Sequence, residues 1–160
     1  MLSVDIICVG KLKERFYAEA CEEYLKRLGA FCSVKVTEFP EARRPKEPSP
    51  AETAAALLKE TEQILSAIPK GAFTVAMCIE GKSLSSEGFS ELFSEAGTRG
   101  FSRAAFIIGG SDGLHESVKS QAHCKLSMSK MTFPHHLARV MLLEQIYRAF
   151  CIRGGRKYHK

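Results

Sequence analysis

AAFIIGGSDG, residues 104–113, joins a nearly all-apolar run to a turn that contains three glycines. A run as apolar as 104–108 is typical of a parallel strand that is buried on both faces of a sheet. At the end of such a strand, glycines leave backbone N–H groups open to a ligand, and open α/β sheets bind ligands in that crevice. A tight strand-to-helix turn without a ligand gives the same pattern. The turn is neither G-x-G-x-x-G nor a P-loop, and no lysine follows it, which disfavours ATP hydrolysis.

Extended and helical patterns alternate on both sides of this stretch. We expect strands at 2–9, 34–39, 73–79, 104–108 and 124–128, and helices at 11–28, 51–68, 85–98, from about 114, and at 136–152. Strand and helix repeated five times predict an α/β fold with a mostly parallel sheet flanked by helices. The chain has 160 residues and no linker long enough to divide it, so one domain over 1–160 is expected.

The composition is that of an ordinary soluble globular protein, with 45% apolar and 26% charged residues. Its apolar runs are shorter than the ~18–20 residues that a membrane helix needs. The apolar N-terminal stretch carries Asp5 and lacks a basic flank, so it indicates a strand rather than a signal peptide. We therefore expect a cytoplasmic protein without a membrane partner. Its six cysteines form no C-x-x-C pair, which favours buried thiols over a zinc site.

Two loops have unusual compositions. Residues 40–50 contain four prolines together with Arg43, Arg44 and Lys46, which is typical of either a mobile surface connection or a basic loop that faces RNA. Residues 128–136, MSKMTFPHH, carry more large apolar side chains than a loop usually does, so we expect them to pack against core, a partner subunit or a flat ligand such as adenine. Adjacent histidines point in different directions and no H-E-x-x-H follows, so no metal site is expected.

The last helix and the tail also have unusual compositions. Within 137–152 the clearly polar residues do not share one face; they are Arg139, Glu144, Gln145 and Arg148. A helix that is apolar almost all round is buried almost all round, which predicts a two-fold homodimer or, alternatively, a helix central to one domain. The tail adds Arg153, Arg156, Lys157 and Lys160 to Tyr158 and His159 without an acid. Such a patch can neutralise phosphate and stack on a base, although many such tails are merely solvated.

Together these segments resemble the RlmH family of 23S rRNA (pseudouridine-N3)-methyltransferases, which is part of the SPOUT superfamily. The likeness spans the chain and is carried by VGKLK (9–13), IEGKSLSS (79–86), FIIGGSDGL (106–114), SMSKMTFPH (127–135), EQIYRA (144–149) and the dipeptide at 158–159. It implies a homodimeric enzyme that uses S-adenosylmethionine to methylate N3 of a pseudouridine in 23S rRNA of the large ribosomal subunit. It also implies a C-terminal trefoil knot, with the knot and cofactor site in about 104–160, and suggests the assembled ribosome as substrate.

The resemblance carries over to single residues. It implies cofactor contacts at Met77, Gly109, Met128, Ser129, Lys130, Met131, Thr132 and Phe133. It leaves no role for a metal. His159 is the expected proton acceptor or orienter, because histidine as a residue type is suited to general acid–base chemistry, and Tyr158 is expected to stack on or hydrogen-bond the base. RNA binding is expected at Arg153, Arg156, Lys157, Tyr158 and His159, with the tail able to serve in trans.

Two other functions fit parts of the pattern. A non-catalytic ribosome-binding or RNA-binding protein would also use a basic tail. A nucleotide-binding α/β module of the flavodoxin kind would use a glycine turn, but the missing phosphate-binding lysine argues against it.

Overall fold

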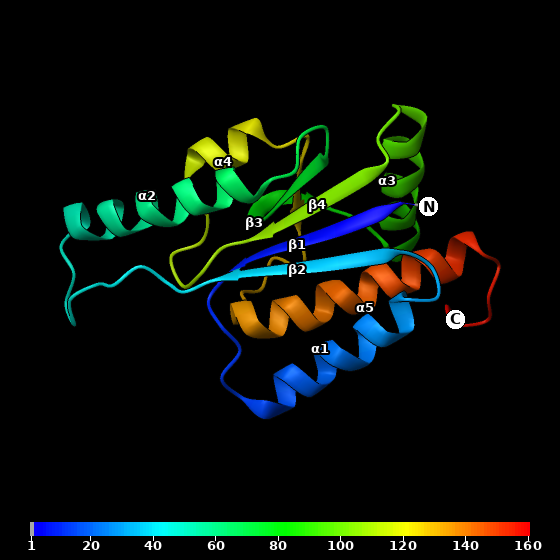
Figure 1. Cartoon of the computed structure of the whole chain (residues 1–160), viewed down its shortest axis with the longest axis horizontal. Helices are drawn as coiled ribbons and strands as arrows, with labels where there is room; N and C mark the ends of the chain where they lie inside the picture. The colour runs from blue at the N-terminus through cyan, green and yellow to red at the C-terminus, as the bar shows by residue number, and fades with distance from the viewer. Residues whose placement is uncertain (1) are drawn as a thin grey trace.

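The computed structural model describes residues 2–160, which form a five-stranded sheet covered by helices on both faces (Figure 1). In chain order the elements are β1 (Ser3–Val9), α1 (Arg15–Leu28), β2 (Ser33–Phe39), α2 (Pro50–Ala67), β3 (Phe73–Ser83), α3 (Ser86–Thr98), β4 (Arg103–Ile108), α4 (Glu116–Gln121), β5 (Cys124–Ser127) and α5 (His135–Arg153). The strand order is β2-β1-β4-β3-β5, and every neighbouring pair is parallel. The α/β fold expected from the sequence is confirmed.

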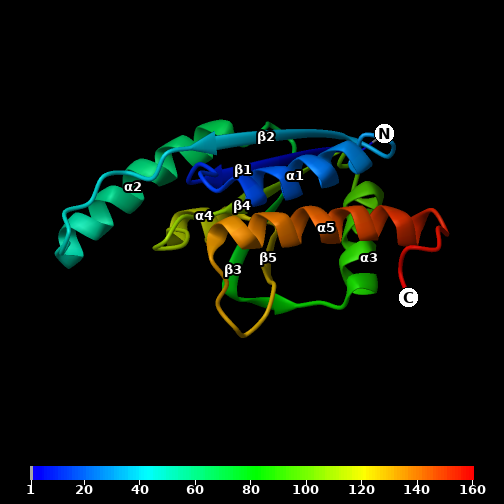
Figure 2. The ribbon, with the colours of Figure 1, turned by 90° about the horizontal axis from the view of Figure 1, so that it is seen from below.

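Side-chain alternation along the strands builds two apolar layers. In β1, Val4 and Ile6 face the layer that includes α1, α3 and α5, whereas Ile7 and Val9 face the layer beneath α2 and α4. Figures 1 and 2 show these helices on opposite sides of the sheet. Residues 104–108 of β4 are all buried, which explains why this part of the strand is apolar, whereas Arg103 at its start is exposed. Burying each such side chain contributes roughly 1.5–3 kcal/mol.

Strand β3 is longer than the sequence indicates. We expected it to end at residue 79, but the strand runs on to Ser83. Its pairing with β5 shifts register between Met77 and Lys82. A Cβ on Gly81 would lie 2.6 Å from the backbone of Leu126, so this glycine lets two strands approach closely rather than turning the chain.

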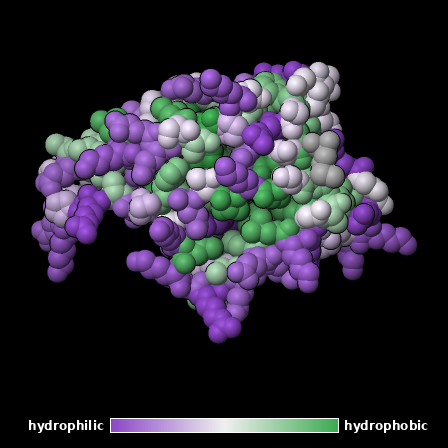
Figure 3. All heavy atoms as spheres, viewed as in Figure 1, coloured by the Kyte–Doolittle hydropathy of each residue, from purple (hydrophilic) through white to green (hydrophobic). Residues whose placement is uncertain are grey.

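The segment before α2 projects from the body of the molecule. Ser49 and Glu52 form a capping box, with Pro50 in the first turn, so the helix starts abruptly after the loop. Hydrophilic side chains gather at this projecting end, whereas apolar residues are gathered over the middle of the same face (Figure 3). Within residues 2–160, none of the helices combines the length and hydropathy needed to cross a bilayer.

Candidate functional site

The carboxyl ends of β3, β4 and β5 surround a cavity of about 820 Å³. Three segments line most of it: 77–80 at the bend of β3, 108–114 after β4, and 126–135 between β5 and α5. Because the strands are parallel, their carboxyl ends lie at one edge of the sheet, where ligands bind in open α/β folds. The loop after β5 crosses below this edge in Figure 2 and forms the outer wall. The cavity has the size of a site for a small ligand or cofactor.

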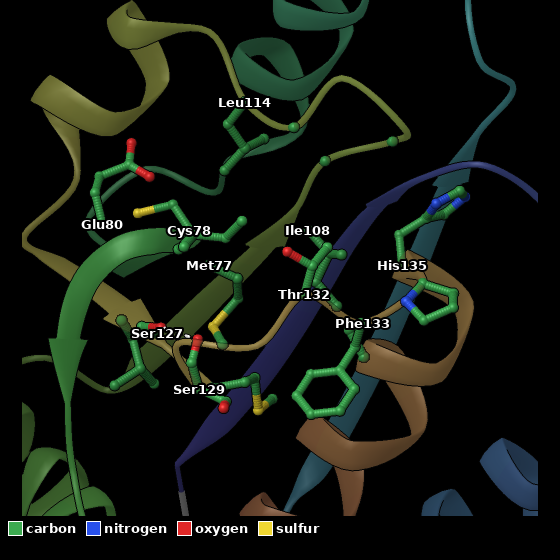
Figure 4. A pocket seen from close by; sticks show the side chains of 18 of the residues that line it. Met77, Cys78, Glu80, Ile108, Leu114, Ser127, Ser129, Thr132, Phe133 and His135 are labelled. Carbon is green, nitrogen blue, oxygen red and sulfur yellow. Dashed lines mark hydrogen bonds between the residues drawn. The ribbon is translucent and has the colours of Figure 1, made fainter.

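The walls of the cavity are largely apolar. Met77 and Phe133 lie on facing sides of it, and Ile108 stands between them (Figure 4). Of the residues for which a cofactor contact was expected, all but Lys130 line the cavity: Met77, Gly109, Met128, Ser129, Met131, Thr132 and Phe133. Lys130 is exposed and lies outside the lining. Residues far apart in the sequence are thus brought together around one space that suits a flat, partly apolar ligand.

The glycine turn forms a tight wall of the cavity. A Cβ on Gly109 would lie 2.3 Å from the carbonyl oxygen of Gly113, so only glycine allows this approach. Gly113 has φ of 71° and donates its N–H to Gly110 at 3.0 Å, which closes the turn. The turn is therefore held in one shape by its own backbone.

One end of the cavity carries polar groups that the sequence did not single out. Glu80 and Lys119 form an ion pair there, beside the thiol of Cys78 (Figure 4). Burial, together with the charge of Glu80, raises the pKa of Cys78, so its thiol stays protonated near neutral pH. The expectation of buried thiols is correct for the other cysteines, but Cys78 is half-buried. Its position next to Met77 in the sequence is the signal that could have identified it.

His135 lines the opposite end of the cavity as the first residue of α5. Burial and then the neighbouring His136 lower its pKa, which keeps the ring neutral near pH 7. Its Nε2 lies 3.6 Å from a carboxylate oxygen of Glu41. Across residues 2–160, no cluster of three or more histidine, cysteine or acidic side chains could hold a metal ion.

The C-terminal tail lies outside this cavity and packs on α5. Tyr158 makes an edge-on contact with Tyr147, at 4.7 Å between ring centroids, and donates its hydroxyl to Glu144 at 3.2 Å. Burial and then the charge of Glu144 raise the pKa of Tyr158 to about 12, so its hydroxyl remains a hydrogen-bond donor. Glu144 also pairs with Arg148, one helical turn further along α5.

His159 is held by two side chains. Its Nε2 lies 2.7 Å from Glu87 at the start of α3, and its Nδ1 lies 3.3 Å from the guanidinium of Arg148. Because a guanidinium only donates, this arrangement favours the tautomer with the proton on Nε2. Neither His159 nor Tyr158 lines the cavity of its own chain, whereas the side chains of Arg153, Arg156 and Lys157 remain exposed.

The basic loop is only partly free to bind RNA. The side chain of Arg44 is 13% exposed and pairs with Glu60 and Asp112, so its charge is already neutralised. Arg43 and Lys46 are exposed. Arg44 thus fastens the loop to α2 and to the glycine turn, and RNA binding by the exposed Arg43 and Lys46 stays a prediction.

Comparison with known proteins identifies one family that matches nearly the whole chain. Residues 2–159 match the family described as "Predicted SPOUT methyltransferase". A Clostridium acetobutylicum protein named "Ribosomal RNA large subunit methyltransferase H" is 46% identical over 159 residues, covering 99% of this chain and 100% of its own. A Bifidobacterium animalis subsp. lactis protein of the same name is 47% identical with the same coverage.

Solved structures show the same fold at low identity. A probable methylase family protein from Haemophilus influenzae Rd KW20 has a TM-score of 0.58 and 12% identity, over 98% of this chain and 70% of that chain. A probable methyltransferase from Bordetella pertussis Tohama I also has a TM-score of 0.58, with 13% identity over 92% of this chain and 95% of that chain. These neighbours support the arrangement of strands and helices and nothing finer.

Proposed function

The chain belongs to the SPOUT methyltransferase family, and from that premise we propose that it methylates N3 of a pseudouridine in large-subunit (23S) ribosomal RNA, using S-adenosylmethionine. The cavity that Met77, the glycine turn and the 128–133 loop surround carries the proposal, because its segments coincide with those expected to hold this cofactor. A ribosomal substrate places the protein in the cytoplasm. We further propose that 1–160 is one domain and that its C-terminal part, about 104–160, forms a trefoil knot.

The residues present fit the cofactor. Methionine and phenylalanine side chains offer flat, polarisable walls for adenine, and backbone groups of the glycine turn can hydrogen-bond polar atoms. Bound there, S-adenosylmethionine supplies an electrophilic methyl group. The protein must place N3 in line with that methyl group and accept the imide proton. The raised pKa of Cys78 is consistent with direct transfer to the base without a covalent enzyme intermediate.

The tail supplies the proposed catalytic and RNA-binding groups. Tyr158, protonated at neutral pH, stacks on or donates a hydrogen bond to the base, while Arg153, Arg156 and Lys157 neutralise phosphates. His159 accepts the proton or orients the base. To accept a proton at Nδ1, it must first release Arg148, so we propose that binding of RNA loosens this contact.

A second copy of the chain completes the site in this proposal. The tail lies away from the cavity of its own chain, so its groups act on the cavity of a partner in a homodimer. An unfilled groove of about 280 Å³ runs along α5, lined by Tyr24, Val140, Met141, Glu144 and Gln145. At the cavity, Ile79 is 59% exposed and Met131 is 73% exposed, which is unusual for large apolar side chains. Both features fit an interface between two copies.

Methyl transfer by purified protein tests the proposal. Ribosomes or 23S rRNA from cells lacking this chain would be incubated with radiolabelled S-adenosylmethionine and the protein. We expect label in 23S rRNA, and a large loss of single-turnover rate in His159→Ala. An unchanged rate in that variant would remove His159 from the chemistry. Label in no RNA, together with intact ribosome binding, would favour the non-catalytic RNA-binding protein.

Mixing two defective chains tests the action of the tail in trans. One chain would carry Gly109→Ala in the cofactor pocket, and the other would lack residues 153–160. Mixed dimers should regain activity, because one intact pocket meets one intact tail. A mixture as inactive as its parts would show that each subunit works alone.

A further inference from the structure

We propose that Arg44, held by Glu60 and aided by Glu41, is a positioning residue that sets the shape of the glycine turn 109–113 and thereby the affinity of the pocket for its cofactor. The inference rests on the proposed function, since it concerns the turn that would hold S-adenosylmethionine. Neither Arg44 nor Glu41 lines the cavity, so both act through the turn.

The first link fixes Arg44 to α2. Glu60 is buried, with 1% of its side chain exposed, and its carboxylate accepts hydrogen bonds from Arg44 at 3.2 Å and from the N–H of Ala42 at 3.3 Å. Arg44 also donates to the carbonyl oxygen of Ala42 at 2.7 Å. A carboxylate buried this deeply requires a partner of opposite charge. The loop at 42–44 is therefore fastened to the helix.

The second link joins Arg44 to the glycine turn. Its Nε lies 2.6 Å from a carboxylate oxygen of Asp112, as an ion pair without hydrogen-bond alignment. Asp112 and the rest of this turn line the cavity. One guanidinium thus connects a buried carboxylate of α2 with a wall of the pocket.

The third link runs through Glu41. Its carboxylate accepts hydrogen bonds from the backbone N–H of Ser111 at 2.8 Å and from the hydroxyl of Ser111 at 2.9 Å. Burial alone would raise the pKa of Glu41, but these hydrogen bonds outweigh burial and lower it, so the carboxylate stays ionised. A Cβ on Gly110 would lie 2.5 Å from this carboxylate, so a glycine here lets the turn rest against Glu41 without moving its side chain. Glu41 also approaches His135 on the far wall.

A paired substitution distinguishes a role of Arg44 in positioning the glycine turn from a role in folding. Arg44→Gln alone leaves Glu60 buried without a countercharge and should lose stability. The double variant Arg44→Gln with Glu60→Gln removes both charges together, so its folding should recover, but nothing then holds Asp112. Lys59→Gln is the control, because it removes an exposed cation next to Glu60 in the sequence.

Calorimetric titration with S-adenosylhomocysteine is the first readout, and methylation kinetics are the second. We expect about tenfold weaker binding in the folded double variant and unchanged binding in the control. The KM for S-adenosylmethionine should rise with little change in kcat, because saturating cofactor restores the turn. Equal binding by wild type and double variant overturns the positioning role. Failure of the wild type itself to bind refutes the proposed cofactor instead.

Discussion

Replacing Gly109 with alanine should damage the pocket far more than the fold. The new Cβ would lie 2.3 Å from the carbonyl oxygen and 2.4 Å from the carbonyl carbon of Gly113, where ordinary contact begins at 3.4 Å. Both neighbours are backbone atoms, so no side chain can rotate away. The two sides of the turn must move apart by about 1 Å, at a cost of roughly 1–3 kcal/mol in folding.

Cofactor binding should suffer more, because the displaced backbone lines the cavity. A shift of this size removes hydrogen bonds that depend on alignment, so we expect at least about tenfold weaker binding of S-adenosylhomocysteine. Calorimetry would measure the affinity and urea unfolding the stability. Gly97→Ala is the matched control, because Gly97 lies in α3 with no heavy atom within 4 Å of its added Cβ. It should gain about 0.5–1 kcal/mol and keep full affinity. Wild-type affinity in Gly109→Ala would refute the role of the turn.

Three further predictions concern stability. Arg139 is 2% exposed and donates hydrogen bonds to Glu38 and, at 2.7 Å, to the carbonyl oxygen of Gly10. Arg139→Leu should therefore lose about 2–4 kcal/mol of stability in urea unfolding. A loss below about 0.5 kcal/mol would contradict this prediction. Ser49→Ala removes the capping box of α2 and should cost about 1 kcal/mol, whereas Ser49→Asp should keep most of that stability. His135 has a folded pKa below its ordinary 6.5, so its contribution is fully present above pH 6.5 and is lost as pH falls toward the folded pKa. His135→Gln should therefore lose less stability between about pH 7.5 and 5.5 than wild type does, and an identical loss would show that other groups titrate.

The parts of the fold that depend on short-range patterns could be predicted from the sequence. The apolar run at 104–108 is β4, and the helix expected at 85–98 is α3, which Ser85 caps. The pairing of Glu144 with Arg148 needed only their helical spacing. These features are decided within a few residues, where periodicity and capping rules apply.

Features that depend on distant contacts could not be predicted. Glycine is common in turns, yet Gly81 lies inside β3. There the backbone of β5 approaches so closely that a side chain would not fit. In the sequence, Arg44 is one of three cations in a proline-rich loop. Only the folded chain brings it to Glu60 and Asp112. The predicted start of α1 was also wrong. The helix begins at Arg15 rather than at residue 11, because the chain leaves β1 at Gly10 with φ of 95°.

The cofactor contacts were expected from the family resemblance, and the sequence pattern of one loop agrees with them. The 128–133 loop carries apolar side chains that must be covered, and it follows a strand whose end lies at the ligand-binding edge of the sheet. The tail carries no such constraint. Its docked position depends on Glu87, at the start of α3, and on side chains of α5.

Mass spectrometry of 23S rRNA from cells that lack this chain is the decisive test of the proposed methylation. We expect one methyl group to be lost, at N3 of a pseudouridine, and to return when the wild-type chain is supplied. We also expect Gly109→Ala to restore the methyl group poorly and Gly97→Ala to restore it fully. Ribosomal RNA with the same methylation in the presence and absence of the chain would contradict the account.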